Sequence, residues 1–347
     1  MMKLFRMFLM PIIILLTIGS ASMAFFQPKI FRTFATKKEV GWVGIMGYDG
    51  SNYWFRSSYG LLRYDPGQKK YFSYDFGERI DNIGYRPEPV MCMSRVKDQM
   101  WFGLHTKGMA VYNAEQDNFV YYGIDDGIPY YQVGNDKYSK VTAISYDEHT
   151  DKVWIGTIRG GLAVYNRRTK VCHSLAEPKL KGINVSGIVI TDKNVIIAGE
   201  QIIYVYDKIN NIWEYHDVLD KKSEIRDIIK FDNDSIALSV RNFDDKSTGN
   251  VGVFSLNSRE LSILPNWNIW VDDIETIDNY LILAWDHGIS FYNIETKKIK
   301  TFNTWHGLIS RWVNDVFING DDIWVTTQDG ISIGKVQDVL KALKEID

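Results

Sequence analysis

One short pattern recurs along almost the whole chain, and it limits the possible fold more than any other feature. Each copy has an apolar strand, often with Trp at its second position, then a small residue and a tight turn ending in Gly. A second strand follows and ends in an aromatic residue and Asp or Asn. The copy at 153–166 reads VWIGTIRGGLAVYN, and similar copies begin at Tyr53, Met100 and Asp322. Such self-similarity at a regular period predicts a protein built from one repeating unit.

Three weaker copies lie between the strong ones, at 195–207, 235–256 and 281–293, and in these an aliphatic residue replaces Trp. The Trp position and its equivalents fall at 54, 101, 154, 196, 236, 282 and 324. A spacing of about 40–53 residues is that of one four-stranded propeller blade. Seven copies therefore predict seven blades.

Each hairpin is preceded by an apolar segment suited to an inner strand and followed by an outer strand, except in the last copy. The segment 29–34 near the N-terminus has the pattern of the missing outer strand, and pairing it with the last blade would remove an open sheet edge. After 331–333 the chain shows helical spacing of Val336, Val339, Leu340 and Leu343. The sequence thus predicts an all-β, seven-bladed β-propeller over 25–335, closed by an N-terminal strand and followed by a short C-terminal helix over 336–347.

The first 24 residues have the pattern of a signal peptide. Lys3 and Arg6 precede an apolar run, and small residues up to Ala24 follow. We therefore expect an exported protein in the periplasm, on the cell surface or outside the cell. An uncleaved anchor is the alternative, in which case the signal segment would be the only contact with the membrane.

Charge and cysteine content exclude further classes. Without Lys3 and Arg6 the chain keeps 38 basic and 43 acidic residues, so it has no basic footprint for nucleic acid or anionic lipid. Cys92 and Cys172 are the only cysteines, and they fall on different strand positions of different blades. We expect two free thiols rather than a disulfide framework.

The copy from Trp154 to Asn166 resembles the two-component regulator propeller repeat. The segments 124–129 and 303–310 resemble the linker that precedes the inner strand in that family. Members commonly form the extracytoplasmic sensor half of bacterial hybrid regulators, before a membrane helix and a histidine kinase. The resemblance implies an exported propeller that binds a ligand or partner. Because this chain ends soon after the last copy, we expect it to act without a kinase of its own.

In propellers the outer-to-inner loops and the turns of the core hairpins share one face, and by analogy with the fold we expect binding there. Aromatic and arginine side chains map to that face and suit sugar rings, acidic substituents or a protein partner. The alternative is that long loops bury their own aromatic residues. The candidates are Tyr85, Tyr130, Tyr131, Trp267, Trp270, Trp305, Trp312, Arg56, Arg159, Arg241 and Arg311.

Three histidines, His105, His287 and His306, map to the same face. A histidine beside a carboxylate could act as an acid or base or bind a metal, but no tight ligand spacing supports this. We expect no cofactor. The favoured function is an exported, non-enzymatic propeller that recognises a glycan or an envelope protein as an accessory to sensing, and we expect it to be a monomer. A lyase or hydrolase and a structural scaffold are the alternatives.

Overall fold

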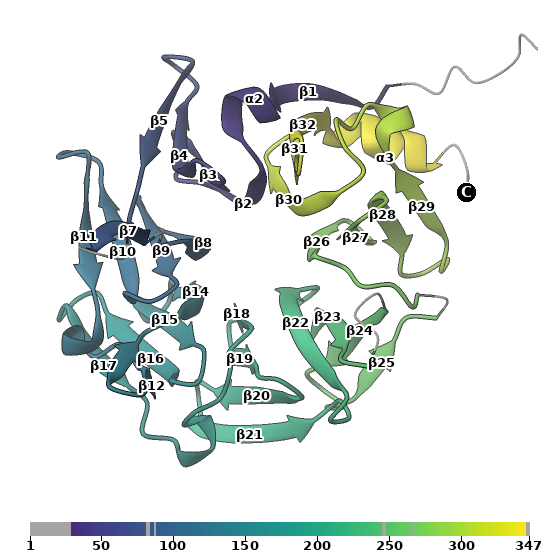
Figure 1. Ribbon diagram of the computed structural model, residues 1–347. Coiled ribbons are helices and arrows are strands. Elements are labelled where there is room, and N and C mark those ends of the chain that lie inside the picture. The colour runs from purple at the N-terminus through teal and green to yellow at the C-terminus, as the bar shows by residue number, and fades with distance from the viewer. Residues whose placement is uncertain (1–28, 81–83, 87, 245–247, 266, 345–347) are drawn as a thin grey trace, which may run out of the picture.

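The computed structural model describes residues 29–344 except 81–83, 87, 245–247 and 266. Within these residues the strands form seven four-stranded antiparallel sheets, and the sheets surround a central channel (Figure 1). The predicted all-β, seven-bladed propeller is confirmed. The signal peptide expected over 1–24 lies outside the described residues.

The blades are numbered here from the N-terminus, and each runs from an inner strand at the channel to an outer strand at the rim. The inner strands are β2 (Val43–Tyr48), β8 (Val90–Val96), β14 (Val141–Asp147), β18 (Gly187–Ile190), β22 (Ser223–Lys230), β26 (Asp273–Ile277) and β30 (Val313–Asn319). The second strands are β3 (Tyr53–Ser57), β9 (Gln99–Leu104), β15 (Lys152–Thr157), β19 (Asn194–Ala198), β23 (Ser235–Asn242), β27 (Tyr280–Trp285) and β31 (Asp322–Thr327).

The third strands are β4 (Gly60–Asp65), β10 (Met109–Asn113), β16 (Gly161–Asn166), β20 (Ile202–Asp207), β24 (Gly249–Ser255), β28 (Gly288–Asn293) and β32 (Gly330–Lys335). The outer strands of blades 1 to 6 are β5 (Lys70–Tyr74), β11 (Asn118–Tyr122), β17 (Val171–Ser174), β21 (Ile212–Asp217), β25 (Leu261–Ile263) and β29 (Ile299–Phe302).

The outer strand of blade 7 comes from the other end of the chain. Strand β1 (Phe31–Thr36) pairs antiparallel with β32, with Phe31 opposite Gly334 and Thr36 opposite Gly330. Gly330 has φ +128°, and a Cβ there would lie 2.2 Å from the carbonyl oxygen of Ala35. Only glycine tolerates both the turn and this close approach of β1. The predicted closure by the N-terminal strand is confirmed.

The repeated Trp packs between neighbouring blades. Trp54, Trp101, Trp154 and Trp324 are at most 5% exposed. In three of the four cases the partner is the aromatic residue that ends the third strand of the next blade. Trp54 meets Tyr112 at 4.7 Å between ring centroids, Trp101 meets Tyr165 at 5.2 Å and Trp154 meets Tyr206 at 5.6 Å. The Trp of the second strand in one blade and the aromatic residue near the end of the third strand in the next blade thus pack against each other.

The polar residue after each aromatic position turns the chain toward the outer strand. In five blades its side-chain oxygen accepts the backbone N–H groups two and three residues further on. These residues are Asp65, Asn113, Asn166, Asp207 and Asn293. Such local bonds explain why the repeat needs Asp or Asn there.

Blade 5 corrects the predicted position of one repeat. Its register places Ser239 opposite Asp227, as Gly156 lies opposite Ala143 in blade 3. The equivalent of Trp154 is therefore Ala237 and not Ile236. Without a Trp, the apolar run 236–238 could be aligned in either of two ways, and the prediction chose the wrong one.

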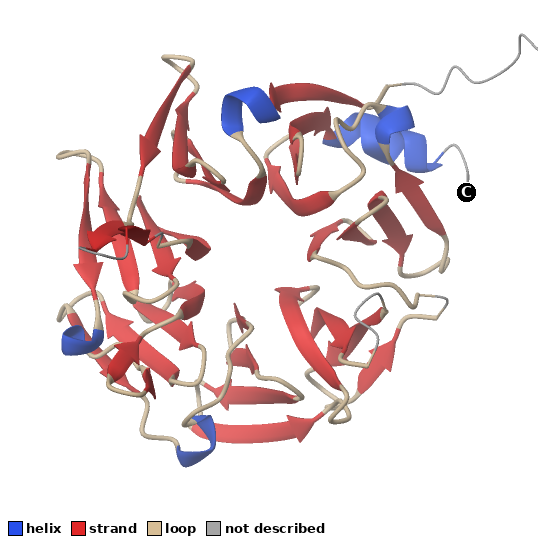
Figure 2. Ribbon diagram, viewed as in Figure 1, coloured by secondary structure: helices blue, strands red, loops and turns tan. Residues whose placement is uncertain are grey.

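Two short hairpins and five short helices lie outside the seven blade sheets in the described residues. Hairpins β6/β7 (Glu78–Ile80, Gly84–Arg86) and β12/β13 (Tyr131–Val133, Asp136–Tyr138) precede blades 2 and 3. The helices, which Figure 2 shows at the periphery, are α2 (Lys37–Val40), η1 (Ile124–Asp126), η2 (Pro178–Leu180), η3 (Thr304–His306) and α3 (Val336–Lys344).

Helix α3 confirms the helical spacing at the C-terminal end. Val339, Ala342 and Leu343 are buried in the cluster that blades 6 and 7 share. Lys300 Nζ donates to the carbonyl oxygen of Ala342 at 2.7 Å. The amphipathic face of the helix therefore packs on the side of the propeller.

Candidate functional site

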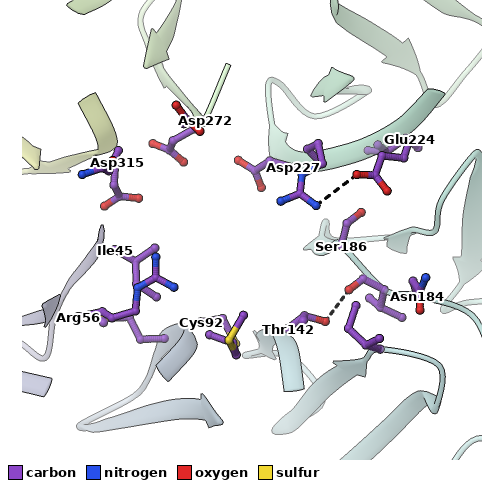
Figure 3. A pocket seen from close by; sticks show the side chains of 18 of the residues that line it. Ile45, Arg56, Cys92, Thr142, Asn184, Ser186, Glu224, Asp227, Asp272 and Asp315 are labelled. Atoms are coloured by element: carbon purple, nitrogen blue, oxygen red, sulfur yellow. Dashed lines mark hydrogen bonds and ion pairs between the residues drawn. The ribbon is translucent and has the colours of Figure 1, made fainter. Parts of the chain in front are cut away.

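A cavity of about 530 Å³ opens where the inner strands begin (Figure 3). The first residues of the inner strands line it, together with residues of the core hairpins such as Arg56, Ile158 and Glu200. This is the face on which the sequence placed the binding site. We call this space the central cavity.

The inner strands share an irregularity at the cavity. In five of them a register shift follows the first apolar residue, for example between Val141 and Ala143 and between Val313 and Asp315. A bulge of this kind bends the strand and redirects its side chains. The residue opposite the position two after the Trp position can therefore be compared around the ring, and in blade 1, where Met46 pairs with Phe55, this residue is Ile45.

That position divides the ring into two unlike parts. From blade 1 to blade 4 the position holds Ile45, Cys92, Ala143 and Gly187. From blade 5 to blade 7 it holds Asp227, Asp273 and Asp315. We call these three aspartates the acidic arc.

Each carboxylate of the acidic arc accepts backbone N–H groups. Asp273 Oδ2 accepts the N–H of Val316 in blade 7 at 2.9 Å, and Asp315 Oδ2 accepts that of Met46 in blade 1 at 3.0 Å. Asp227 accepts from Ile228 at 2.8 Å and from Ile274 in blade 6. The acidic arc therefore joins each of three blades to the next.

Burial and mutual repulsion raise the pKa values in the acidic arc. Burial is the largest cause for Asp227, Asp273 and Asp315, and the charges of Asp315 and Asp227 raise the pKa of Asp273 further. On the same inner strand, burial raises the pKa of Glu275 to about 7. Burial also raises the pKa of Asp272, whose side chain is exposed to the cavity, to about 6.

Three Trp–Arg pairs stand at equivalent places around the mouth. Trp270, Trp312 and Trp42 each come just before the first apolar residue of the inner strand segment, in blades 6, 7 and 1. Arg241, Arg311 and Arg56 lie over these rings, with Cζ 5.3, 5.1 and 5.2 Å from the ring centroids. Trp42 and Arg56 line the cavity itself. The pairs place aromatic faces and cations on one side of the mouth.

Two of these arginines have further partners. Arg241 forms an ion pair with Glu224, and Arg56 Nη1 donates to the carbonyl oxygen of Val90 at 3.3 Å. Burial lowers the pKa of Arg56, while the charge of Asp315 opposes that shift. These contacts hold both guanidinium groups in place.

The remaining aromatic candidates lie apart from the cavity lining. Tyr130 is exposed beside hairpin β12/β13, and Arg159 Cζ lies 5.9 Å from the ring centroid of Tyr131. Trp267 is 5% exposed within the core between blades 5 and 6, where its Nε1 donates to Ile269. Trp305, in η3, is 76% exposed. Tyr85 lies in β7, and its side chain is outside what the structure describes.

The three histidines do not meet in the cavity. His105 lies in the turn of blade 2, with its backbone N–H bonded to Pro89. His287 Nδ1 lies 2.6 Å from Asp286, and its ring stacks on Trp285. His306 Nδ1 accepts the backbone N–H of Asn303, and burial lowers its pKa. No group of three or more His, Cys, Asp or Glu in the described part of the chain is arranged to hold a metal ion.

The sequence reasoning missed the acidic residues and Trp42. A signal was present, because the inner segments of blades 5 to 7 carry Asp at the same place, two residues after an apolar residue: Ile225, Val271 and Val313. Blades 1 to 4 lack this Asp, so the pattern was visible only after alignment of the inner strands.

Comparison with known proteins supports the fold alone. No family model matches the chain, and no curated protein matches it in sequence. Among solved structures it is similar to the extracellular domain of BT4673 from B. thetaiotaomicron, described in one structure as a one component system and in another as a hybrid two component system. The TM-scores are 0.67 and 0.66, with 16% and 15% identity over 89% and 88% of this chain. The chain spans 40% of the length of either structure.

Propellers of other kinds are almost as similar. The WD40 domain of Pan2 from Neurospora crassa matches with a TM-score of 0.62 and 10% identity, over 90% of this chain and 97% of that one. A shape shared this widely does not assign a function. In the described residues, none of the helices has the length and apolar character needed to cross a membrane.

Proposed function

We propose that this chain is an exported propeller that recognises a ligand at the central cavity, without converting it chemically. The observation that carries the proposal is the cavity itself, which has the size of a small-molecule site and is lined by charged, amide, hydroxyl and aromatic side chains from all seven blades. The two BT4673 structures are of an extracellular domain, which is consistent with export.

A glycan or an envelope protein is the proposed ligand. The face of Trp42 suits a sugar ring, and carboxylates, Asn184 and Ser186 offer the hydrogen bonds that hydroxyl groups need. We extend the proposal to an accessory role in sensing. The blades enclose the cavity on all sides, so a bound ligand would change the surface at the cavity mouth, and a partner protein could recognise that change.

A glycan array probed with the full-length protein tests the proposal. We expect at least one glycan to bind, and we expect Ser186→Trp to abolish that binding because an indole would fill part of the cavity. The matched control is Ser262→Trp, which adds the same side chain on the outer strand of blade 5, away from the cavity.

Near-ultraviolet circular dichroism checks that both variants keep the fold. Binding that survives Ser186→Trp would show that the cavity is not the site. Loss of binding in both variants would contradict the proposal as well, because the effect would then not depend on the cavity.

A further inference from the structure

The central cavity has two chemically different walls. Asp227, Asp272 and Asp315 lie on one side of the opening, and Ile45, Cys92 and Thr142 lie on the other (Figure 3). Glu224 and Asp273 extend the first side, which we call the acidic wall. Trp42, Met91 and Met93 extend the second, which we call the apolar wall. A ligand that fills the cavity therefore meets carboxylates on one side, and thioethers, Ile, an indole and the guanidinium of Arg56 on the other.

The cationic residues of the cavity already have partners. Arg226 Nη1 lies 3.3 Å from Glu224 Oε1, and Arg241 pairs with the same carboxylate. Arg56 is held by Val90 and by the ring of Trp42. By contrast, none of the ion pairs within the described residues reaches Asp227, Asp272, Asp273 or Asp315. Within the described residues these four carboxylates thus have no ion-pair partner, although the charges of Arg226 and Arg56 lower the pKa values of Asp227, Asp272 and Asp315.

From this arrangement, and on the basis of the proposed function, we infer that the cavity selects a ligand unit carrying an ammonium group next to an apolar face. The ammonium group would lie against Asp272, whose side chain is exposed in the cavity lining and, among the described residues, makes no hydrogen bond to the backbone that would have to break. The apolar face of the same unit would pack on Trp42 and Met93. An amino sugar and a short alkylamine share this chemistry.

The opposite preference, for an acidic ligand, is disfavoured by the same contacts. The sequence suggested that arginines on this face suit acidic substituents. In the structure Arg241 and Arg226 are paired with Glu224, which leaves Arg56 as the one arginine of the cavity lining without an ion pair among the described residues, and an anion bound there would face the acidic wall. Desolvating a like charge there is costly.

Proton linkage gives the inference a second readout. The groups that face Asp272 are Asp286, in the turn of blade 6, whose charge raises its pKa, and Arg226 on β22, whose charge lowers it. Because burial has raised this pKa to about 6, part of the Asp272 population is protonated at pH 5 and binds a cation poorly. We expect the affinity for an alkylamine, whose ammonium group stays protonated over this range, to increase between pH 5 and pH 7.5.

Calorimetric titration of the full-length protein tests the inference with matched probes. The sugar probes are the tetramers of glucosamine, N-acetylglucosamine and galacturonic acid, which carry ammonium, neutral and anionic groups. Hexylamine and hexanol are the matched non-sugar pair. We expect the glucosamine tetramer, hexylamine or both to bind at least about tenfold more tightly than their uncharged counterparts, the factor expected for one charge-assisted hydrogen bond.

The sugar and non-sugar probes distinguish an amino sugar from an alkylamine as the ligand. Preference for glucosamine over hexylamine identifies an amino sugar, and the reverse identifies an alkylamine. If the neutral or the anionic tetramer binds as tightly as the amine and Ser186→Trp abolishes that binding, the inference fails while the proposed function stands. If none of the five probes binds, the inference is also overturned, and the glycan array still decides the proposed function.

Asp272→Asn locates the interaction. It keeps the size of the side chain and removes the charge, so we expect amine affinity to fall about tenfold or more and to lose its dependence on pH. The control is Asp329→Asn, an exposed carboxylate on the same face that pairs with Lys37 at 3.9 Å. Equal affinity of Asp272→Asn and the unaltered protein for the amine would overturn the inference.

Discussion

The blades of this ring are joined in two different ways. At the interfaces from blade 1 to blade 4 a buried Trp packs against the aromatic residue of the next blade. In blades 4 to 6 the Trp is replaced by Ile196, Ala237 and Ile282. Instead, the interfaces from blade 5 to blade 7 carry the carboxylates of the acidic arc, each accepting a backbone N–H of the following blade.

The comparison shows that two of the three blades which look degenerate in sequence, blades 5 and 6, have exchanged one kind of joint for another. An aromatic contact contributes through buried area and ring geometry and does not respond to pH. A buried carboxylate contributes through hydrogen bonds but carries a desolvation cost. The second kind of joint also brings carboxyl groups to the cavity: blades 5 and 6 lack the Trp and carry Asp227 and Asp273, blade 7 has both Trp324 and Asp315, and blade 4 has neither.

The interface between blades 7 and 1 uses both joints and should be the most sensitive to disruption. Trp324 packs on Tyr53 at 4.4 Å, Asp315 accepts from Met46, and β1 completes blade 7 from outside. Deleting residues 27–35 removes most of β1 and exposes the edge of β32. We expect loss of the folded state, seen as loss of a cooperative thermal transition by circular dichroism.

The control for the deletion is removal of residues 342–347, which shortens α3 but leaves all blades complete. That variant should keep a cooperative transition, at lower temperature. A stable, monomeric protein lacking 27–35 would show that the inner joints close the ring without β1.

Substitutions at one repeat position compare the two kinds of blade directly. Trp101→Ala removes the contact with Tyr165 and should lower the free energy of unfolding by about 3–5 kcal/mol. Ile282→Ala, at the equivalent place in blade 6, should cost less, about 2–3 kcal/mol, because fewer buried atoms are lost. Urea denaturation measures both, with exposed Val171→Ala as the control. A larger loss at Ile282 would mean that the aromatic contacts are not the stronger joints.

The fold was predictable because its determinants are local and repeated. Trp154, Gly161 and Asn166 each perform a role that is fixed by the blade: filling the interface, turning the hairpin and starting the next turn. Residues with these roles occur at the same place in most blades, so the blades can be aligned from the sequence alone. In blade 5 these markers are absent, and there the alignment was wrong by one residue.

The cavity was less predictable because its chemistry depends on contacts between blades. Asp273 is recognisable as part of a site only when its neighbours Asp227 and Asp315 are known to lie beside it across blade boundaries. Trp42 could not be separated from other aromatic residues, since what distinguishes it is its place before an inner strand and its contact with Arg56. The sequence identified the face, while the choice of residues on that face required the packing.

We expect the smallest change in the free energy of unfolding at Asp273. Two substitutions separate its hydrogen bond to blade 7 from its charge. Asp273→Ala removes the acceptor of the Val316 N–H and should cost about 1–3 kcal/mol at pH 5, because a buried donor is left unsatisfied. Asp273→Asn keeps an acceptor oxygen and removes only the charge. It should therefore be nearly neutral at pH 5 and neutral or stabilising at pH 7.5.

The sign follows from proton binding. In the unfolded chain the carboxyl of Asp273 has its ordinary pKa of 3.8, whereas burial and the charges of Asp315 and Asp227 raise that pKa in the folded chain. The folded state then holds more protons, so the free energy of unfolding decreases as the pH rises from about 4 through the raised pKa. Asp273→Asn should reduce this decrease, because the side chain that takes up the extra proton is gone.

Urea denaturation at pH 5 and pH 7.5 measures the difference, with Asp329→Asn as the exposed control. The same pH dependence in Asp273→Asn and in the unaltered protein would mean that this carboxyl carries no strained charge. The acidic arc would then be a set of ordinary hydrogen bonds, and the distinction between the two kinds of blade joint would rest on the Trp residues alone.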